Sequence, residues 1–155
     1  MTLRKQKITP FLWFDGKAEE AMNFYVSVFA NSKVKSLSRG PDGKVFSAVF
    51  QLEGQQFYAL NGGPQYKFSP AISMFVSCGT QKEVDGLWAK LSAAGTTNRC
   101  GWLDDKFGLT WQIIPSLLGK YLQDKDPAKA GRVMQAMLKM VKIDIALLKQ
   151  AYAGK

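Results

Sequence analysis

One pattern of predicted strands and helices occurs twice in this chain, and the duplication restricts the possible folds more than any other feature of the sequence. The first copy is predicted as a strand, a helix and three strands, at residues 8–14, 17–29, 32–38, 44–52 and 56–61. The second copy is predicted as a strand, a helix and then short extended segments, at residues 71–78, 84–94, around 96–103 and at 109–115. The order strand–helix–strand–strand–strand therefore covers residues 7–61 and again residues 71–115.

An apolar stripe marks the helix of each copy. The two stripes share one spacing and are Ala18, Ala21, Met22, Tyr25 and Val28, then Val84, Leu87, Trp88, Leu91 and Ala94. Residues with this spacing lie on one side of a helix. Gly95 is a candidate helix stop, because glycine is favoured just after the last helical turn. The linker at residues 61–70 is rich in glycine and proline, as expected between two modules.

A helical tail follows the second copy, over about residues 117–153. Asp126 is a predicted N-cap and Pro127 a predicted first helical residue. The apolar stripes of two predicted tail helices are Ala130, Val133, Met134, Met137, Leu138 and Val141, then Leu147, Leu148, Ala151 and Tyr152. Such a stripe is typical of core packing, but its methionines also suit an adaptable surface for a partner.

Length and composition indicate one globular domain over residues 1–155, since 155 residues with 46% hydrophobic content can bury a full core. No run approaches the roughly 18 apolar residues of a membrane span. The apolar N-terminal stretch is short and interrupted by Pro10, so we expect a first strand there rather than a signal peptide. We therefore expect a cytoplasmic protein.

Charge and residue counts exclude several function classes. The net charge is +9, but the basic residues are scattered and no recognition motif accompanies them, so we expect no nucleic-acid partner and no membrane. The chain has no histidine, which excludes Ser-His-Asp and Cys-His catalysis and any histidine-containing metal site. Cys78 and Cys100 lack a CxxC spacing and are predicted to be free thiols.

Four phrases resemble the PhnB-like branch of the vicinal oxygen chelate superfamily, which includes glyoxalase I, bleomycin-resistance proteins and extradiol dioxygenases. They are ITPFLWFDGKAEEAMNFY, FYALNGGP, CGWLDDKFGLTWQIIP and DPAKAGRVMQAMLKMVKIDIALLKQAYAG. The resemblance implies an α+β fold of two tandem βαβββ modules that form a shared cleft, followed by C-terminal helices. It also implies a homodimer. Members of the branch often carry the label 3-demethylubiquinone-9 3-methyltransferase.

In the metal enzymes of this superfamily, four side chains from related strands hold a divalent ion. Carried over one at a time, these positions fall on Thr9, Ser73, Gln112 and, at the end of the first module, Ala59, with Asn61 two residues later on the same strand face. None of these residues supplies an anionic ligand, so we expect no metal and no cofactor. Neutral hydrogen-bonding groups suit a polar organic ligand instead.

Strand alternation predicts which side chains line the cleft, because residues two apart share a face. The faces with mixed polar and aromatic residues are expected to face the ligand, and the purely apolar faces to face the helices. The predicted ligand-binding residues are Thr9, Phe11, Trp13, Asn61, Ser73, Phe75, Trp102 and Gln112. A solvated sheet face without a ligand is the alternative interpretation.

Three residues are weak catalytic candidates. Asp104 and Asp105 precede the last strand, and either carboxylate could act as a general base at the rim of the cleft, although acids in turns are common. Cys100 shares a predicted strand face with Trp102, but no base accompanies it in the sequence.

Three functions remain open from the sequence. The first is a metal-independent protein that binds a small, partly aromatic or anionic organic molecule of unknown identity. The second is a metal-independent enzyme acting on such a molecule in the same cleft, and the third is an interaction module that binds a partner through the C-terminal helices. Methyl transfer is not supported, because the chain lacks the glycine-rich strand–loop–helix element that binds S-adenosylmethionine.

Overall fold

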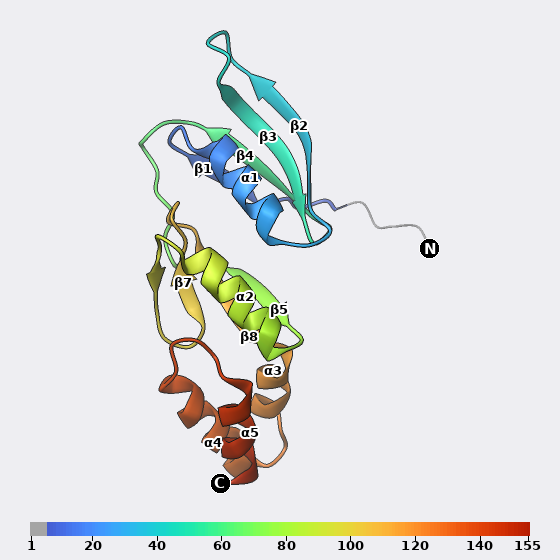
Figure 1. Cartoon of the computed structure of the whole chain (residues 1–155), viewed down its shortest axis with the longest axis vertical. Coiled ribbons are helices and arrows are strands. Elements are labelled where there is room, and N and C mark those ends of the chain that lie inside the picture. The colour runs from blue at the N-terminus through green and yellow to red at the C-terminus, as the bar shows by residue number, and fades with distance from the viewer. Residues whose placement is uncertain (1–5) are drawn as a thin grey trace, which may run out of the picture. The chain divides into compact units, whose positions relative to one another are not determined.

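The computed structural model describes residues 6–155, which divide into two compact units, one up to Phe68 and one from Ser69 (Figure 1). The elements of the first unit are β1 (Phe11–Phe14), α1 (Ala18–Val28), β2 (Lys33–Arg39), β3 (Val45–Leu52) and β4 (Gln55–Asn61). Those of the second are β5 (Met74–Cys78), α2 (Gln81–Ser92), β6 (Thr96–Thr97), β7 (Trp102–Asp104), β8 (Thr110–Pro115), α3 (Ser116–Leu122), α4 (Pro127–Leu138) and α5 (Ile145–Ala153).

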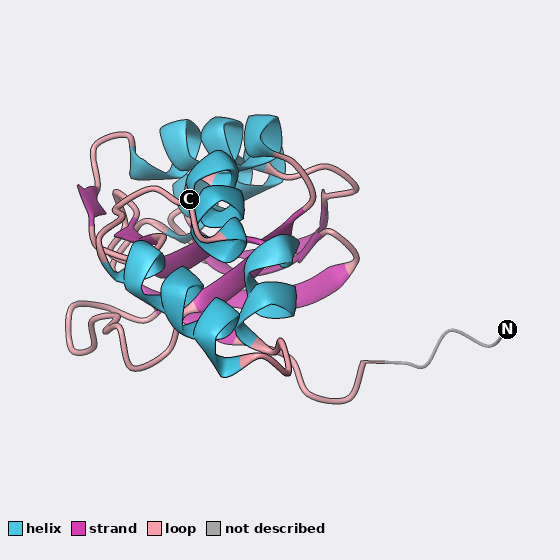
Figure 2. Cartoon of the chain, turned by 90° about the horizontal axis from the view of Figure 1, so that it is seen from below, coloured by secondary structure: helices cyan, strands magenta, loops and turns pink. Residues whose placement is uncertain are grey.

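The predicted duplication is confirmed by the topology of the two sheets. The strand order is β1-β4-β3-β2 in the first unit and β5-β8-β7-β6 in the second. In each sheet the first strand pairs parallel with the last, and the remaining pairs are antiparallel. Both units therefore have the α+β architecture of a βαβββ module, with its helices and strands distinguished by colour in Figure 2.

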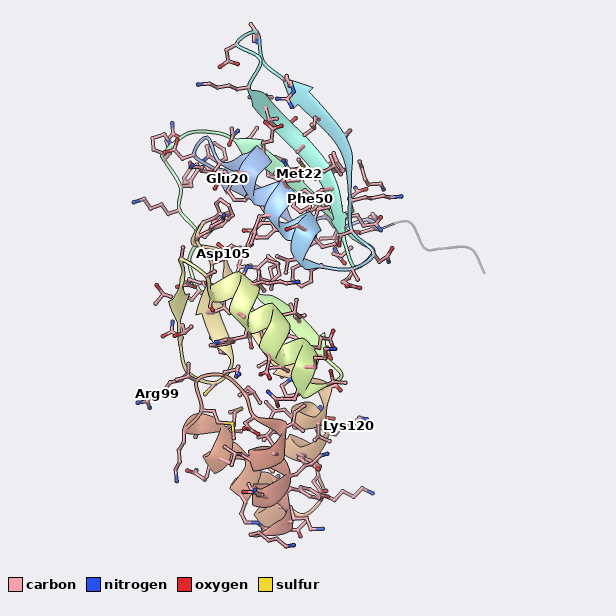
Figure 3. The ribbon with its side chains drawn as sticks, in the orientation of Figure 1. Glu20, Met22, Phe50, Arg99, Asp105 and Lys120 are labelled. Atoms are coloured by element: carbon pink, nitrogen blue, oxygen red, sulfur yellow. The ribbon has the colours of Figure 1, made fainter. Side chains whose placement is uncertain are left out.

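In the first unit, α1 packs against one face of the sheet through the predicted stripe. Ala18, Ala21 and Tyr25 are all completely buried, and the two alanines allow the helix backbone to approach the strands closely. Met22 from α1 and Phe50 from β3 are buried in the layer between helix and sheet (Figure 3). The Tyr25, Phe50 and Phe57 rings form a stacked series, and burying such rings is the main source of stability for this layer.

In the second unit, α2 buries Val84 and Leu91 and ends at Ser92, earlier than predicted. The left-handed backbone conformation after the helix belongs to Ala94, with φ of 57°, rather than to Gly95. A side chain at position 95 would collide with the backbone carbonyl oxygen of Asp104. Gly95 is therefore required for this close approach to β7, and not as the helix stop that the sequence predicted.

The tail is part of the core of the second unit. Ile114 at the end of β8 packs with Leu118 and with four residues beyond it, which are Val133, Met140, Ile143 and Leu148. The predicted N-cap is confirmed, since the Asp126 carboxylate accepts hydrogen bonds from the N–H groups of Ala128 and Lys129. Within residues 6–155, no helix combines the length and the apolar character that crossing a membrane requires.

Hydrogen bonds also fix the tail to the turn before β7 and to α2. The N–H groups of Cys100 and Gly101 donate to the carbonyl oxygens of Met140 and Val141, each at 2.8 Å. The Gln81 side chain donates to the Ile143 carbonyl oxygen and accepts from the Ile145 N–H. The segment that leads into α5 is therefore held on both sides by the second unit.

Candidate functional site

The face of the second sheet that α2 leaves uncovered carries four of the predicted ligand-binding residues. Phe75 on β5 and Trp102 on β7 are the neighbours of Gln112 on β8, on either side of it. The Phe75 side chain is 62% exposed, whereas Trp102 and Gln112 are half-buried. Ser73 lies two residues before Phe75. The structure thus brings Ser73, Phe75, Trp102 and Gln112 together as the sequence predicted.

The side-chain amide of Gln112 forms a hydrogen bond with another side chain and not with a backbone group. Its Nε2 donates to Ser73 Oγ at 2.8 Å, which fixes the amide across the β5–β8 pair. The Gln112 Oε1 atom and the Ser73 hydroxyl hydrogen have no hydrogen-bond partner among residues 6–155. The pair therefore presents one acceptor and one donor on the open face, between an exposed phenylalanine and a tryptophan.

The open face is limited at both ends of β8, where strand alternation puts Thr110 and Ile114 on the same side as Gln112. Ile114 is covered by the tail helices, and Thr110 is buried. The Thr110 hydroxyl donates to Asp104 Oδ1 at 2.5 Å, and Asp104 is the cross-strand neighbour of Thr110. Asp104 therefore lies on the same face as Gln112, with one carboxylate oxygen occupied.

Asp105 lies on the opposite, helix-facing side and is only 3% exposed. Its Oδ1 accepts from the N–H groups of Phe107 and Leu109, and its Oδ2 accepts from the indole N–H of Trp111 at 2.8 Å. A carboxylate with three donors inside a tight turn organises the β7–β8 connection. The structure therefore does not place Asp105 among the residues of the open face.

In the first unit, Phe11 and Trp13 lie on the uncovered face of the sheet, while Leu12 and Phe14 are buried against the helix side, as predicted. The Trp13 indole N–H donates to the Gly63 carbonyl oxygen at 2.9 Å, and the Tyr66 ring packs edge-on against it. Part of Trp13 is therefore covered by the segment after β4. Thr9 precedes β1 and is half-buried, with its Oγ1 at 3.5 Å from the Gln6 amide nitrogen.

Asn61 differs from the expectation that it shares the open face. Its Oδ1 accepts from the Ala18 N–H at the start of α1, and its Nδ2 donates to the Val45 carbonyl oxygen. Ala59 is also buried, on the helix-facing side of β4. The residue of β4 that lies on the open face is Tyr58, which pairs with Phe11 and has its ring centroid 5.9 Å away. Alternation along QFYALN could have identified Tyr58.

Cys100 also differs from its expected place beside Trp102. It precedes β7 in a turn with a positive φ of 60°, and its Sγ lies 3.7 Å from the Met137 carbonyl oxygen of α4. The thiol is thus directed at the tail helices. Strand alternation does not hold across this turn, so Cys100 and Trp102 do not share a face.

Cys78 is completely buried at the end of β5. Burial raises the pKa of its thiol to about 11, and the nearby Glu83 carboxylate contributes in the same direction. At pH 8 the thiolate fraction should be on the order of one in a thousand, and only the thiolate reacts as a nucleophile.

We therefore predict that a Cys100→Ser variant, in which Cys78 is the remaining thiol, does not react with a thiol-specific disulfide reagent at pH 8 while folded. One thiol per chain should react after denaturation. The absorbance of the product that the reagent releases, followed over an hour, checks the prediction. Rapid reaction of the folded variant would contradict a buried, protonated thiol.

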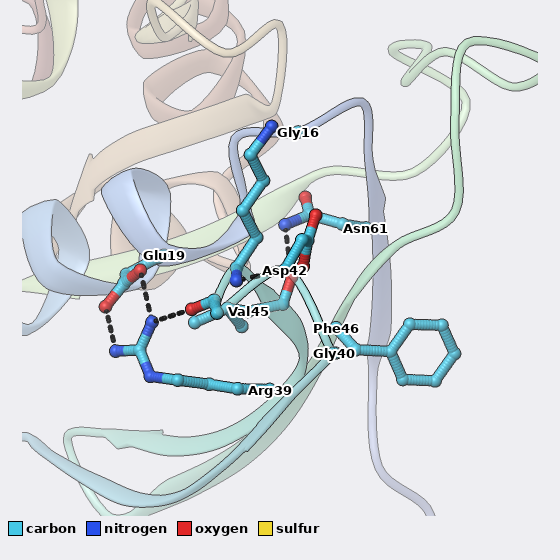
Figure 4. A pocket seen from close by; sticks show the side chains of 10 residues that line it. Gly16, Glu19, Arg39, Gly40, Asp42, Val45, Phe46 and Asn61 are labelled. Atoms are coloured by element: carbon cyan, nitrogen blue, oxygen red, sulfur yellow. Dashed lines mark hydrogen bonds and ion pairs between the residues drawn. The ribbon is translucent and has the colours of Figure 1, made fainter.

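A cavity of about 530 Å³ lies beside α1, next to the irregular pairing of β2 with β3 (Figure 4). Arg39 and Glu19 form an ion pair at 2.7 Å within it, and Arg39 also donates to the Gly43 carbonyl oxygen. Lys44, Asp42 and the exposed Phe46 ring are also part of the lining. The positive charges of Arg39 and Lys44 balance the negative charges of Glu19 and Asp42 in this lining. Apart from Asn61, none of the predicted site residues lines it.

The residues at the expected metal-ligand positions do not suit a divalent cation. Thr9, Ser73 and Gln112 are neutral, and the chain has no histidine. Across residues 6–155 no three cysteine, aspartate or glutamate side chains gather as a metal site would require.

Comparisons with known proteins agree on one family. The family model described as 3-demethylubiquinone-9 3-methyltransferase matches residues 6–114. The chain is 40% identical to a solved structure from Bacillus cereus described as a 3-demethylubiquinone-9 3-methyltransferase and PhnB protein, with a TM-score of 0.69. That match covers 72% of this chain and 100% of the other. No curated protein matches the chain.

Two more distant structures share the fold alone. Protein PA1353 from Pseudomonas aeruginosa is 16% identical, with a TM-score of 0.61, and the match covers 72% of this chain and 98% of that one. The fosfomycin resistance protein FosX from Listeria monocytogenes, complexed with Mn(II) and sulfate, is 13% identical with a TM-score of 0.52. That match covers 70% of this chain and 90% of FosX. The chain belongs to the PhnB-like branch of the vicinal oxygen chelate superfamily.

Proposed function

We propose that this protein binds a small, partly aromatic or anionic organic molecule without a metal ion. The observation that carries the proposal is the Ser73–Gln112 pair on the open face of the second sheet, held at 2.8 Å between Phe75 and Trp102. Apolar walls with a few fixed polar groups are typical of small-molecule sites. The amide and hydroxyl would orient the polar part of the ligand, and the two rings would contact its apolar part.

Metal independence rests on the side chains that replace the family's ligands. FosX, which shares the fold, is described with Mn(II) bound. Here the corresponding positions on the sheet faces are neutral, and a hard divalent cation prefers several anionic oxygen ligands. Elemental analysis of the purified protein tests this part of the proposal. Stoichiometric manganese, zinc, nickel or iron would overturn it.

Asp104 is the observation that favours an enzyme as the second candidate. It lies on the same face as Gln112, and one of its carboxylate oxygens has no partner among the described residues. Such a group could move a proton on a bound substrate. A binding protein returns its ligand chemically unchanged, whereas an enzyme turns it over, so mass spectrometry of the ligand after incubation separates the two.

We also propose that the protein is a homodimer and that it is cytoplasmic. Analytical sedimentation tests the dimer.

We predict that Gln112→Ala and Ser73→Ala each weaken ligand retention at least about tenfold. Each removes one fixed hydrogen-bonding group, and about 1.4 kcal/mol corresponds to a factor of ten in affinity. Retention is measured by native mass spectrometry of co-purified molecules. Thermal shift with a panel of small aromatic carboxylates gives a second measurement, since a ligand stabilises the state that binds it.

Gln150→Ala is the matched control, because Gln150 is an exposed amide on α5, away from the sheet face. It should leave retention unchanged. If Gln112→Ala retains the same molecules as the unmodified protein, the open face of the second sheet is not the binding site.

A further inference from the structure

Helix α4 has an apolar stripe on the side that faces away from the core. Its residues are spaced by four, three and four positions and are Pro127, Gly131, Met134 and Leu138. Val133 on the opposite side is completely buried, whereas Met134 and Leu138 remain 39% and 44% exposed. A side chain at Gly131 would meet no other atom within 4 Å, so the stripe has an open notch one turn before Met134.

A further exposed apolar residue follows the end of the helix. Val141 follows Leu138 by three residues and is 46% exposed, although its carbonyl oxygen is fixed by the N–H of Gly101. Apolar side chains at one face of a helix are normally buried, and here residues 6–155 cover Met134, Leu138 and Val141 only in part. The stripe also lies outside residues 6–114, which the family model matches. It is therefore a feature of the tail and not of the sheet face discussed above.

The charge of the tail indicates what could cover the stripe. Residues 116–155 contain eight lysines and arginines against three aspartates, which gives a net charge of +5. Lys139 directly follows Leu138 and forms no ion pair within the described part of the chain. Two copies meeting at this surface would bring like charges together, which disfavours self-association. An acidic partner would gain favourable electrostatic contacts along the same edge.

We infer that this stripe binds an acidic amphipathic helix of another protein. Met134, Leu138 and Val141 would contact the apolar side of that helix, and the Gly131 notch would admit one of its larger side chains. Lys139 would face its carboxylates. A membrane surface fits less well, because helices that lie on membranes usually carry large aromatic residues on a broad apolar face, and this stripe has none.

The test uses the full chain, because tail residues pack in the core of the second unit and removing them would expose that core. The probe is a fluorescent 16-residue peptide of leucine, alanine and glutamate, with leucine at helical spacing. Two reference peptides replace every glutamate by lysine or scramble the order. Anisotropy should show that the ordered acidic peptide binds at least tenfold more tightly than either reference, and more weakly at high salt.

Met134→Glu and Leu138→Glu should each weaken binding of the acidic peptide at least tenfold. Gln150→Glu is the matched control, because it adds the same charge at an exposed position of α5, outside the stripe, and it should change binding less than threefold. Circular dichroism checks that all three variants stay folded. Equal loss in all three variants, or no preference for the ordered acidic peptide, overturns the inference.

Two further measurements can also overturn it. The first is co-sedimentation with vesicles that contain anionic phospholipid. If the protein binds these vesicles, Leu138→Glu abolishes that binding and the acidic peptide does not bind, the stripe is a membrane contact. A change of oligomeric state in the Met134→Glu variant, measured by sedimentation, would identify it as a contact between copies of this chain. A stripe that binds the acidic peptide alone supports the inference.

Discussion

Asp105→Ala should lower the free energy of unfolding by about 3–5 kcal/mol, a large part of the roughly 5–15 kcal/mol of a typical domain. The carboxylate accepts two backbone N–H groups and the indole N–H of Trp111, and it is almost fully buried. Removing it leaves these donors without an acceptor inside the protein, which costs more than the lost bonds alone. Urea unfolding followed by tryptophan fluorescence measures the change.

Two variants separate this structural role from the catalytic one that the sequence allowed. Asp105→Asn should lose about half as much stability, because its oxygen can still accept while its NH₂ group faces the indole N–H. Asp104→Ala removes the acceptor of one hydroxyl and should cost about 1 kcal/mol. If Asp105→Ala unfolds at the same urea concentration as the unmodified protein, the turn does not depend on this carboxylate.

The repeat, every helix except α3 and most strands could be predicted, because hydrophobic periodicity is a direct consequence of burial on one side. Apolar residues at helical spacing form one side of a helix that is stable when it packs against another element. The alanine, methionine and tyrosine residues of the α1 stripe are all buried in this way. The shared face of Phe75, Trp102 and Gln112 could be predicted for a similar reason. These three residues lie on regular strands, where alternation assigns each side chain to a face, and Ser73 directly precedes β5.

Asn61 shows where this reasoning ends. Residue type alone does not distinguish an amide that holds a strand to a helix from an amide that binds a ligand. Its partners are the Ala18 N–H and the Val45 carbonyl oxygen, 43 and 16 residues away in the sequence. Only the folded chain shows that both its oxygen and its nitrogen are occupied, so the family's metal position gave the wrong face of β4.

Cys100 shows a second limit, which is backbone geometry. Cys100 and Gly101 both have positive φ angles, of 60° and 80°, so the chain turns sharply before β7. Glycine adopts this conformation readily, but a cysteine rarely does, and nothing in the sequence NRCGW predicts it. The turn directs the thiol to α4 and away from Trp102.

Leu148→Ala should lower the free energy of unfolding by about 3 kcal/mol. Leu148 is completely buried in the cluster that joins α4 and α5 to Ile114 of β8, so truncation leaves a cavity among residues fixed from several directions. Leu147→Ala is the matched control, since Leu147 is the preceding residue of the same helix and is 47% exposed. It should cost about 0.5 kcal/mol, as most surface changes do.

The same pair of variants decides whether the tail folds with the second unit or as an independent segment. Three of the four tryptophans lie in that unit and outside the tail, and they are Trp88, Trp102 and Trp111. Tryptophan fluorescence therefore reports unfolding of the sheet and α2. Circular dichroism also reports unfolding of the tail helices. Because Gln81 and Gly101 bind the segment before α5, the cavity at Leu148 should destabilise the sheet as well. Both signals should then shift together to lower urea concentration. Loss of helix signal at a urea concentration where fluorescence is unchanged would mean that the tail unfolds alone, and the stripe on α4 would then belong to a separable module.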